Sequence, residues 1–158
     1  MDTIKITKDH VKMIAHRGVS GLAMENTVAS FTLASEKTYF GIETDIHATK
    51  DNKIIVCHDD NIKRVTGVDK VIEESSFAEL RKILVMNKEG GYAPETYLPT
   101  LNEYIEICKS GNKYAVLEFK NLMTEDNIVQ VLDIIRELNY LENMIFISFV
   151  KENLLKYL

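Results

Sequence analysis

The chain alternates short apolar runs of strand length with longer segments in which apolar residues recur at helical spacing. The short runs predict strands over Lys12–His16, Ile42–Ala48, Lys53–Cys57, Tyr114–Phe119 and Met144–Phe149. The helical spacing predicts helices over Asn26–Thr38, from Ser75 or Ser76 to Leu84, from Thr100 to Gly111, over Thr124–Leu138 and from Lys151 to Leu158. Because strands that alternate with helices form parallel crossover units, the pattern predicts an α/β fold.

One pair of strands departs from this alternation. The stretch "HATKDNKIIVC" is too short for a crossover helix, so its two strands should form a hairpin. A turn at Asp51–Asn52 would set Asp45 opposite His58. Side chains alternate between the faces of a strand, so Glu43 and Asp45 point the same way. We therefore expect Glu43, Asp45 and His58 to converge on one face.

Composition limits the classes of function that remain. The length of 158 residues predicts one domain, and a net charge of -5 argues against nucleic-acid binding, although a local pocket can still be positive. Cys57 and Cys108 lack metal-site spacing and are expected to be buried, with a disulfide or a reactive thiol as the alternatives. The sequence shows no apolar run of membrane-spanning length and no signal-peptide core. We therefore expect a cytoplasmic protein without stable membrane insertion.

Charged and polar residues gather at the ends of the predicted strands, where functional side chains collect in parallel α/β folds. They are His16–Arg17, Glu43 with Asp45, His58–Asp59 and Glu118 with Lys120. Buried carboxylates are costly unless they are paired or bound to a metal. Glu43, Asp45 and Glu118 suit hard oxygen ligands of Mg²⁺ or Ca²⁺ better than ligands of zinc. The alternative is that they form structural ion pairs with Arg17 and Lys120.

Two histidines beside such a site suit general acid–base chemistry, because an imidazole can hold or release a proton near neutral pH. His16 and His58 are the candidates, while His10 and His47 keep the simpler interpretation of hydrogen-bonded structural residues. The Arg17 fork and the Lys120 ammonium suit a phosphoryl group. A metal, two histidines and two cations together fit the cleavage of a phosphate ester.

Four motifs in a fixed order resemble the glycerophosphodiester phosphodiesterase family. They are "IAHRG", "ENTVASF", "GIETDIHATKDNKIIVCHDD" and "LEFK". The resemblance runs from about Met13 to Phe149 and also includes "PTLNE" and "ISF". A lone HRG or HD pair would be weak evidence, whereas the ordered set is specific.

The resemblance implies a TIM-type barrel that hydrolyses glycerophosphodiesters to glycerol 3-phosphate and an alcohol with a divalent cation, Mg²⁺ or Ca²⁺. The resemblance implies that Glu43, Asp45 and Glu118 are metal ligands and that His16 and His58 are the acid–base pair. It also implies that Arg17 and Lys120 contact the phosphate and that Glu25 and Asn26 support the site. Asn26 also suits a helix N-cap. The irregular stretch 61–100 matches the family's variable insertion, which would cover the substrate.

Three questions remain open at this level. The sequence does not assign the acid and the base between His16 and His58. It also leaves open a route in which a substrate hydroxyl attacks first and gives a cyclic phosphate. A lysophospholipase D activity and a catalytically idle module that retains metal and phosphate affinity are the alternative functions.

The length departs from the family's pattern. A complete (β/α)₈ barrel usually needs about 250 residues. This chain supplies barrel strands near residues 13, 42, 114 and 145, with a hairpin after the second. We therefore expect the first half of a barrel, truncated at its C-terminal side. Such a chain would be a fragment of a longer protein or a homo-oligomer that covers the open barrel edges.

Overall fold

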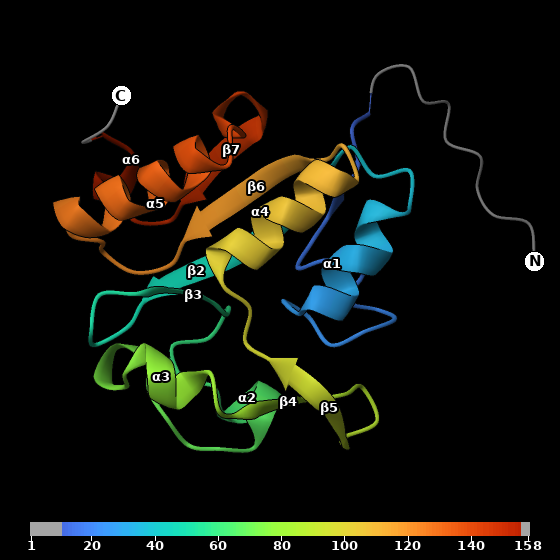
Figure 1. Cartoon of the computed structure of the whole chain (residues 1–158), viewed down its shortest axis with the longest axis vertical. Helices are drawn as coiled ribbons and strands as arrows, with labels where there is room; N and C mark the ends of the chain where they lie inside the picture. Colours follow the sequence, from blue (N-terminus) through green and yellow to red (C-terminus); the bar gives the residue numbers. More distant parts are fainter. Residues whose placement is uncertain (1–10, 156–158) are drawn as a thin grey trace, which may run out of the picture.

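A parallel sheet forms the centre of the structure, a computed structural model that describes residues 11–155 apart from the side chain of Ala93 (Figure 1). Its parallel strands lie in the order β1 (Ile14–Ala15), β2 (Gly41–Ala48), β6 (Tyr114–Phe119) and β7 (Met144–Ser148). The helices between them are α1 (Val28–Ser35), α4 (Leu101–Ser110) and α5 (Glu125–Glu137). The α/β prediction with parallel crossover units is confirmed.

The apolar residues of β2 and β6 pack on these helices through one face of the sheet. The core of this layer contains Ile42 and Ile46 of β2, Leu117 and Phe119 of β6, Phe31 of α1, Tyr104 and Ile105 of α4, and Val131 and Ile135 of α5. The Tyr104 hydroxyl donates to the Ile42 carbonyl oxygen at 2.6 Å, so the buried phenol is hydrogen-bonded. Because side chains alternate along a strand, the opposite face of the sheet receives the polar residues.

Threonine caps fix where the three large helices begin. Thr27, Thr100 and Thr124 each accept a hydrogen bond from the backbone N–H three residues later, as the capping-box patterns require. The prediction that Asn26 is an N-cap is therefore wrong. Asn26 precedes the cap in a left-handed conformation with φ of 52°, which leaves its amide free to point elsewhere.

Two other predicted helices differ from the observed ones. The helix predicted from Ser75 or Ser76 to Leu84 is only α3 (Phe77–Leu80), capped by Ser76, and Leu84 instead begins β4 (Leu84–Met86). Of the helix predicted over Lys151–Leu158, the structure has α6 (Glu152–Leu155), and residues 156–158 lie outside the described part. A short 3-10 turn, η2 (Leu141–Asn143), leads into β7.

The hairpin after β2 is present, but its predicted register is wrong by one residue. β3 (Ile54–Val56) pairs with β2 so that Ala48 faces Ile54, which sets Asp45 opposite Cys57 rather than His58. The reason is a three-residue loop. The Thr49 N–H bonds the Lys53 carbonyl oxygen, and Asn52 takes the left-handed conformation with φ of 55°.

Residues 61–100 form a separate layer beside the carboxyl end of β2 and next to β3 (Figure 1). This layer contains α2 (Lys63–Thr66), the 3-10 turn η1 (Ile72–Glu74), α3, and a two-stranded sheet of β4 and β5 (Tyr92–Tyr97). It has a small core of its own, made by Ile62, Val65, Ile72, Leu80, Val85 and Leu98, which packs on Ile55 and Cys57. The segment is thus tied to the hairpin that follows β2.

Within the described residues, no helix combines the length and the apolar character that crossing a lipid bilayer requires.

Candidate active site

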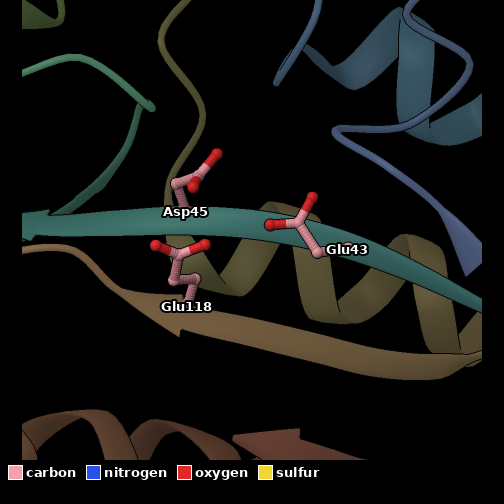
Figure 2. Close-up of side chains that lie close together, drawn as sticks. All are labelled: Glu43, Asp45 and Glu118. Atoms are coloured by element: carbon pink, nitrogen blue, oxygen red, sulfur yellow. The ribbon is translucent and has the colours of Figure 1, made fainter. Parts of the chain in front are cut away.

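Three acidic side chains meet on the face of the sheet opposite the helices. Glu43 and Asp45 come from β2 and Glu118 from β6, and Figure 2 shows the three side chains close together. One carboxylate oxygen from each lies within 4.8 Å of the other two. The strand register explains this proximity, because Asp45 pairs with Glu118 and Glu43 lies two residues earlier on the same face. The structure thus brings together the three acids that the sequence analysis proposed as metal ligands.

The cluster carries more negative charge than its surroundings satisfy. All three side chains are buried, and Glu43 Oε1 and Asp45 Oδ1 have no hydrogen-bond partner. Burial, together with the charge of Asp45, raises the pKa of Glu43 from 4.5 to about 7. Buried carboxylate oxygens without partners are costly, and a hard divalent cation would satisfy them. The donor set therefore fits Mg²⁺ or Ca²⁺.

Two basic residues contact the cluster without neutralising it. The Lys120 ammonium lies 2.9 Å from Glu118 Oε1 and 3.6 Å from Asp45 Oδ1. Arg17 Nε lies 3.5 Å from Asp45 Oδ2, and the Arg17 backbone N–H donates to Glu43 Oε2 at 2.8 Å. The alternative of purely structural ion pairs thus explains two of the three acids in part, and it leaves Glu43 Oε1 without a partner.

The HRG turn is held against the start of α1. Arg17 and Gly18 both have positive φ, 56° and 76°. The Ser30 hydroxyl donates to the Arg17 carbonyl oxygen, and a Cβ at Gly18 would lie 2.6 Å from the Ser30 hydroxyl oxygen. This close approach requires glycine. The turn places the His16 ring at the rim, where its Nε2 lies 3.9 Å from Glu43 Oε2 and its side chain is 69% exposed.

The two residues before the α1 cap support the cluster through side-chain contacts. The Asn26 amide donates to Asp45 Oδ2 at 2.8 Å, and its oxygen accepts from the Thr44 hydroxyl at 2.8 Å. Glu25 accepts from Arg17 Nη1 at 3.0 Å. Glu25 and Asn26, the proposed supporting residues, thus contact Arg17 and Asp45.

His58 lies in the loop after β3. Its Nδ1 lies 2.7 Å from Asp59 Oδ1, and its backbone carbonyl oxygen contacts the buried His47 ring at 3.3 Å. No hydrogen bond or ion pair joins His58 to the three carboxylates among residues 11–155. The prediction that His58 converges with Glu43 and Asp45 through the hairpin register is therefore wrong. His47 has the structural contact expected of it, and His10 lies outside the described residues.

Sequence reasoning named Asp59 only as a partner in the HD pair, without its contact to the His58 ring, and it missed Thr44 and Arg64. Thr44 fixes the Asn26 amide, Asp59 contacts the His58 ring, and Arg64 contacts both Asp59 and Glu25. Arg64 lies in the irregular 61–100 segment, where hydrophobic periodicity gives no signal. The one available hint is an arginine five residues after the HD pair.

Both cysteines are buried and free, as expected for small apolar residues. Burial raises the pKa of the Cys57 and Cys108 thiols to about 12, so they remain protonated near neutral pH and are poor nucleophiles.

Comparison with known proteins gives a consistent result. A family model described as "Glycerophosphoryl diester phosphodiesterase family" matches residues 16–153. A glycerophosphodiester phosphodiesterase from Caldanaerobacter subterraneus subsp. tengcongensis is 31% identical over 142 residues, which cover 87% of this chain and 57% of the relative. A human lysophospholipase D is 44% identical over 69 residues, which cover 44% of this chain and 22% of the relative.

The fold matches solved structures over a similar share. A phosphodiesterase from Oleispira antarctica, solved in complex with the product sn-glycerol-3-phosphate, superposes with a TM-score of 0.82 at 30% identity. The match covers 92% of this chain and 60% of that structure. The four parallel strands therefore correspond to part of a TIM-type barrel, as expected. The chain spans about 60% of the length of the Caldanaerobacter relative and the Oleispira structure.

Proposed function

Because the chain belongs to the glycerophosphoryl diester phosphodiesterase family, we propose that it hydrolyses a small glycerophosphodiester to glycerol 3-phosphate and an alcohol. The observation that carries this proposal is the group of three buried carboxylates with unsatisfied oxygens, flanked by two cations. An acidic cluster of this kind attracts a divalent cation, and the cation with its neighbouring bases attracts a phosphodiester anion.

Glu43, Asp45 and Glu118 would hold the cation. When bound, it supplies positive charge that stabilises the phosphate oxygens as the P–O bond to the alcohol breaks. Arg17 and Lys120 orient the phosphate from the two flanks of the cluster. Glu25 and Asn26 support this arrangement, since Glu25 fixes the Arg17 guanidinium and Asn26 fixes Asp45.

His16 and His58 form the proton-transfer pair of the proposal. One imidazole removes a proton from the nucleophile as its oxygen bonds to phosphorus, and the other protonates the leaving alcohol as its P–O bond breaks. Attack by water gives glycerol 3-phosphate directly, whereas attack by a glycerol hydroxyl of the substrate gives a cyclic phosphate that water then opens. The contact of His58 Nδ1 with Asp59 supports Nε2 as the atom through which His58 exchanges its proton. The exposed His16 ring stands beside Glu43, within reach of a ligand at the cluster.

The test is hydrolysis of glycerophosphocholine by the purified chain with Mg²⁺ or Ca²⁺, followed by ³¹P NMR, which detects both glycerol 3-phosphate and a cyclic phosphate. His58→Ala should reduce turnover by roughly 10²–10⁴-fold. Glu118→Gln should abolish the increase in turnover that the added cation produces. Glu106→Gln, an exposed change on α4 at the helix-covered face, should leave turnover unchanged. Full activity in both site variants would contradict the proposed site.

The human lysophospholipase D among the relatives favours a second candidate substrate, a lysophospholipid. Choline release from lysophosphatidylcholine, compared with release from glycerophosphocholine, decides between the two. Metal binding without turnover of either substrate would instead support the idle module.

The proposal extends to the surroundings of the site. Residues 61–100, as a variable insertion within one domain, would cover the bound substrate. A second copy of the chain would cover the open inner face beside β7, where Ile145, Ile147 and Phe149 are 36%, 37% and 92% exposed. Residence in the cytoplasm and the lack of a nucleic-acid partner stay predictions of the sequence.

A further inference from the structure

Arg64, at the start of α2, forms a bridge between two acidic residues from different parts of the chain. Its Nε and Nη2 atoms donate to Asp59 Oδ2 and Oδ1 at 2.6 and 3.1 Å. Its Nη2 also donates to Glu25 Oε1 at 2.7 Å. The planar fork of a guanidinium allows this geometry, whereas a lysine ammonium cannot match both oxygens of one carboxylate in a plane.

Each of the two acids in turn contacts a residue of the proposed site. Asp59 Oδ1 lies 2.7 Å from His58 Nδ1, and Glu25 Oε1 accepts from Arg17 Nη1 at 3.0 Å. Arg64 thus joins the loop that carries His58 to the turn that carries Arg17. These two loops follow different strands, β3 and β1, and the bridge fixes their spacing.

The contact with Asp59 determines which nitrogen of the His58 ring carries the proton. The Arg64 hydrogen bond, which outweighs partial burial, lowers the pKa of Asp59 to about 2. Asp59 is therefore ionised at neutral pH and can only accept hydrogen bonds. It follows that the His58 proton facing Asp59 sits on Nδ1, which leaves the Nε2 lone pair available.

An isolated pair on the surface would have little effect, because solvent screens it and long side chains resist ordering. Here one fork contacts two carboxylates, and the exposed fractions of the Asp59 and Glu25 side chains are only 27% and 18%. A shared, bidentate arrangement of this kind restrains geometry more than a single exposed pair does.

We propose that Arg64 is a positioning residue of the active site, which holds Asp59 against His58 Nδ1 and so keeps His58 Nε2 free to exchange a proton. The hydrogen bond from Arg64 to Glu25 likewise helps Glu25 to hold the Arg17 guanidinium beside Asp45. The catalytic consequence rests on the proposed phosphodiesterase function, whereas the orientation and tautomer of His58 do not.

The first test reads the His58 tautomer directly, by ¹⁵N NMR of the imidazoles in the labelled, metal-free chain at pH 8.5. The His58 signals are assigned by their loss in His58→Gln. The unaltered chain should show the His58 proton on Nδ1. Lys63→Ala, the control, should show the same, because the exposed Lys63 pairs with Asp69 and not with Asp59. Arg64→Ala should show both tautomers in exchange, because its Asp59 carboxylate is no longer fixed.

Arg64→Lys keeps the charge and guards against misfolding of the alanine variant. It should show a smaller but measurable share of the tautomer with the proton on Nε2. An unchanged His58 spectrum in either folded Arg64 variant would overturn the proposal.

The second test measures hydrolysis of glycerophosphocholine. Arg64→Ala should reduce kcat by roughly 10-fold to 100-fold, the range typical of residues that orient a catalytic group. Arg64→Lys should recover part of the loss, and Lys63→Ala should match the unaltered chain. If the unaltered chain hydrolyses nothing, the proposed function fails, and the NMR measurement still decides the role of Arg64. A kcat in Arg64→Ala equal to that of Lys63→Ala would contradict the catalytic part of the inference.

Discussion

Glu43 is the residue on which burial and charge repulsion act together. Its side chain is held by the Arg17 backbone N–H through one oxygen, while the other oxygen has no partner. Burial, the Asp45 charge and, more weakly, the Glu118 charge all favour the protonated form, which raises its pKa to about 7. A carboxyl in this state responds both to pH and to a bound cation.

We expect the stability of the metal-free protein to fall as the pH rises, through Glu43. A carboxyl whose pKa is higher in the folded than in the unfolded state stabilises the fold fully below its unfolded pKa of 4.5, and this contribution is lost as the pH rises through about 7. The difference corresponds to about 3 kcal/mol. Urea unfolding with a chelator between pH 5 and 8 measures it.

Glu43→Gln is the control, since an amide does not titrate and should remove most of this slope. Saturating Mg²⁺ or Ca²⁺ should reverse the fall at pH 8, because the cation binds the ionised cluster and adds about 2.7 kcal/mol at a hundredfold excess over its dissociation constant. The difference in the free energy of unfolding between the metal-free chain and Glu43→Gln should change between pH 5.5 and pH 8. If it stays the same, Glu43 does not have the raised pKa described here.

At the scale of elements, the site depends on how the strand ends and helix starts are joined. The turn after β1 lies on the first turn of α1, where the Val19 N–H bonds the Ser30 carbonyl oxygen and the Asn26 N–H bonds the Arg17 carbonyl oxygen. The turn after β3 is joined to α2 through Arg64. Short loops with specific backbone conformations therefore position the functional side chains on a rigid sheet.

Gly18→Ala should disrupt the junction between β1 and α1. Gly18 has φ of 76°, and an added Cβ would lie 2.7 Å from the Ser30 carbonyl carbon, so both backbone strain and a clash result. We expect a loss of about 2–4 kcal/mol in the free energy of unfolding, measured by urea denaturation.

Gly21→Ala is the matched control, because a Cβ there meets nothing within 4 Å and the glycine lies in the same turn region. It should change stability by less than about 0.5 kcal/mol. Equal stability of the two variants would show that the turn after β1 is not packed on α1 as described.

At the scale of the whole molecule, helices cover one face of the sheet, and the other face is partly open. Helices cover one face, while on the other the apolar side chains Ile14, Ile145, Ile147 and Phe149 are at least one-third exposed. Glu118 pairs with Ile147 in the register of β6 and β7, so this apolar surface adjoins the carboxylate cluster. An exposed apolar surface beside parallel edge strands favours association.

We expect the chain to form a homodimer or a larger homo-oligomer in solution. Size-exclusion chromatography with light scattering should give a mass above 18.1 kDa, the mass of one chain. Ile147→Lys should shift the mass toward one chain, because it places a charge in the proposed interface. Val129→Lys, at a comparably exposed position on α5, should not. A monodisperse 18.1 kDa species for the unaltered chain would refute this prediction.

The sequence by itself determined the order of the strands and large helices, since hydrophobic period and threonine caps are local signals. It also determined which acids share a face, because alternation along β2 fixes Glu43 and Asp45 together and the ordered motifs resemble one family. Only the tertiary structure decided the hairpin register, because Asn52 can adopt a left-handed conformation that lengthens the loop by one residue.

Tertiary structure likewise decided which residues support the site. Asn26 reads locally as a helix cap, yet its amide contacts Asp45, nineteen positions later. For Arg64 the only local hint is its place five residues after the HD pair. Its role arises from contacts with Glu25, thirty-nine positions earlier, and with Asp59 across a loop. Alternation and capping act within a few residues, whereas contacts of this kind exist only once the chain has folded and brought distant loops together.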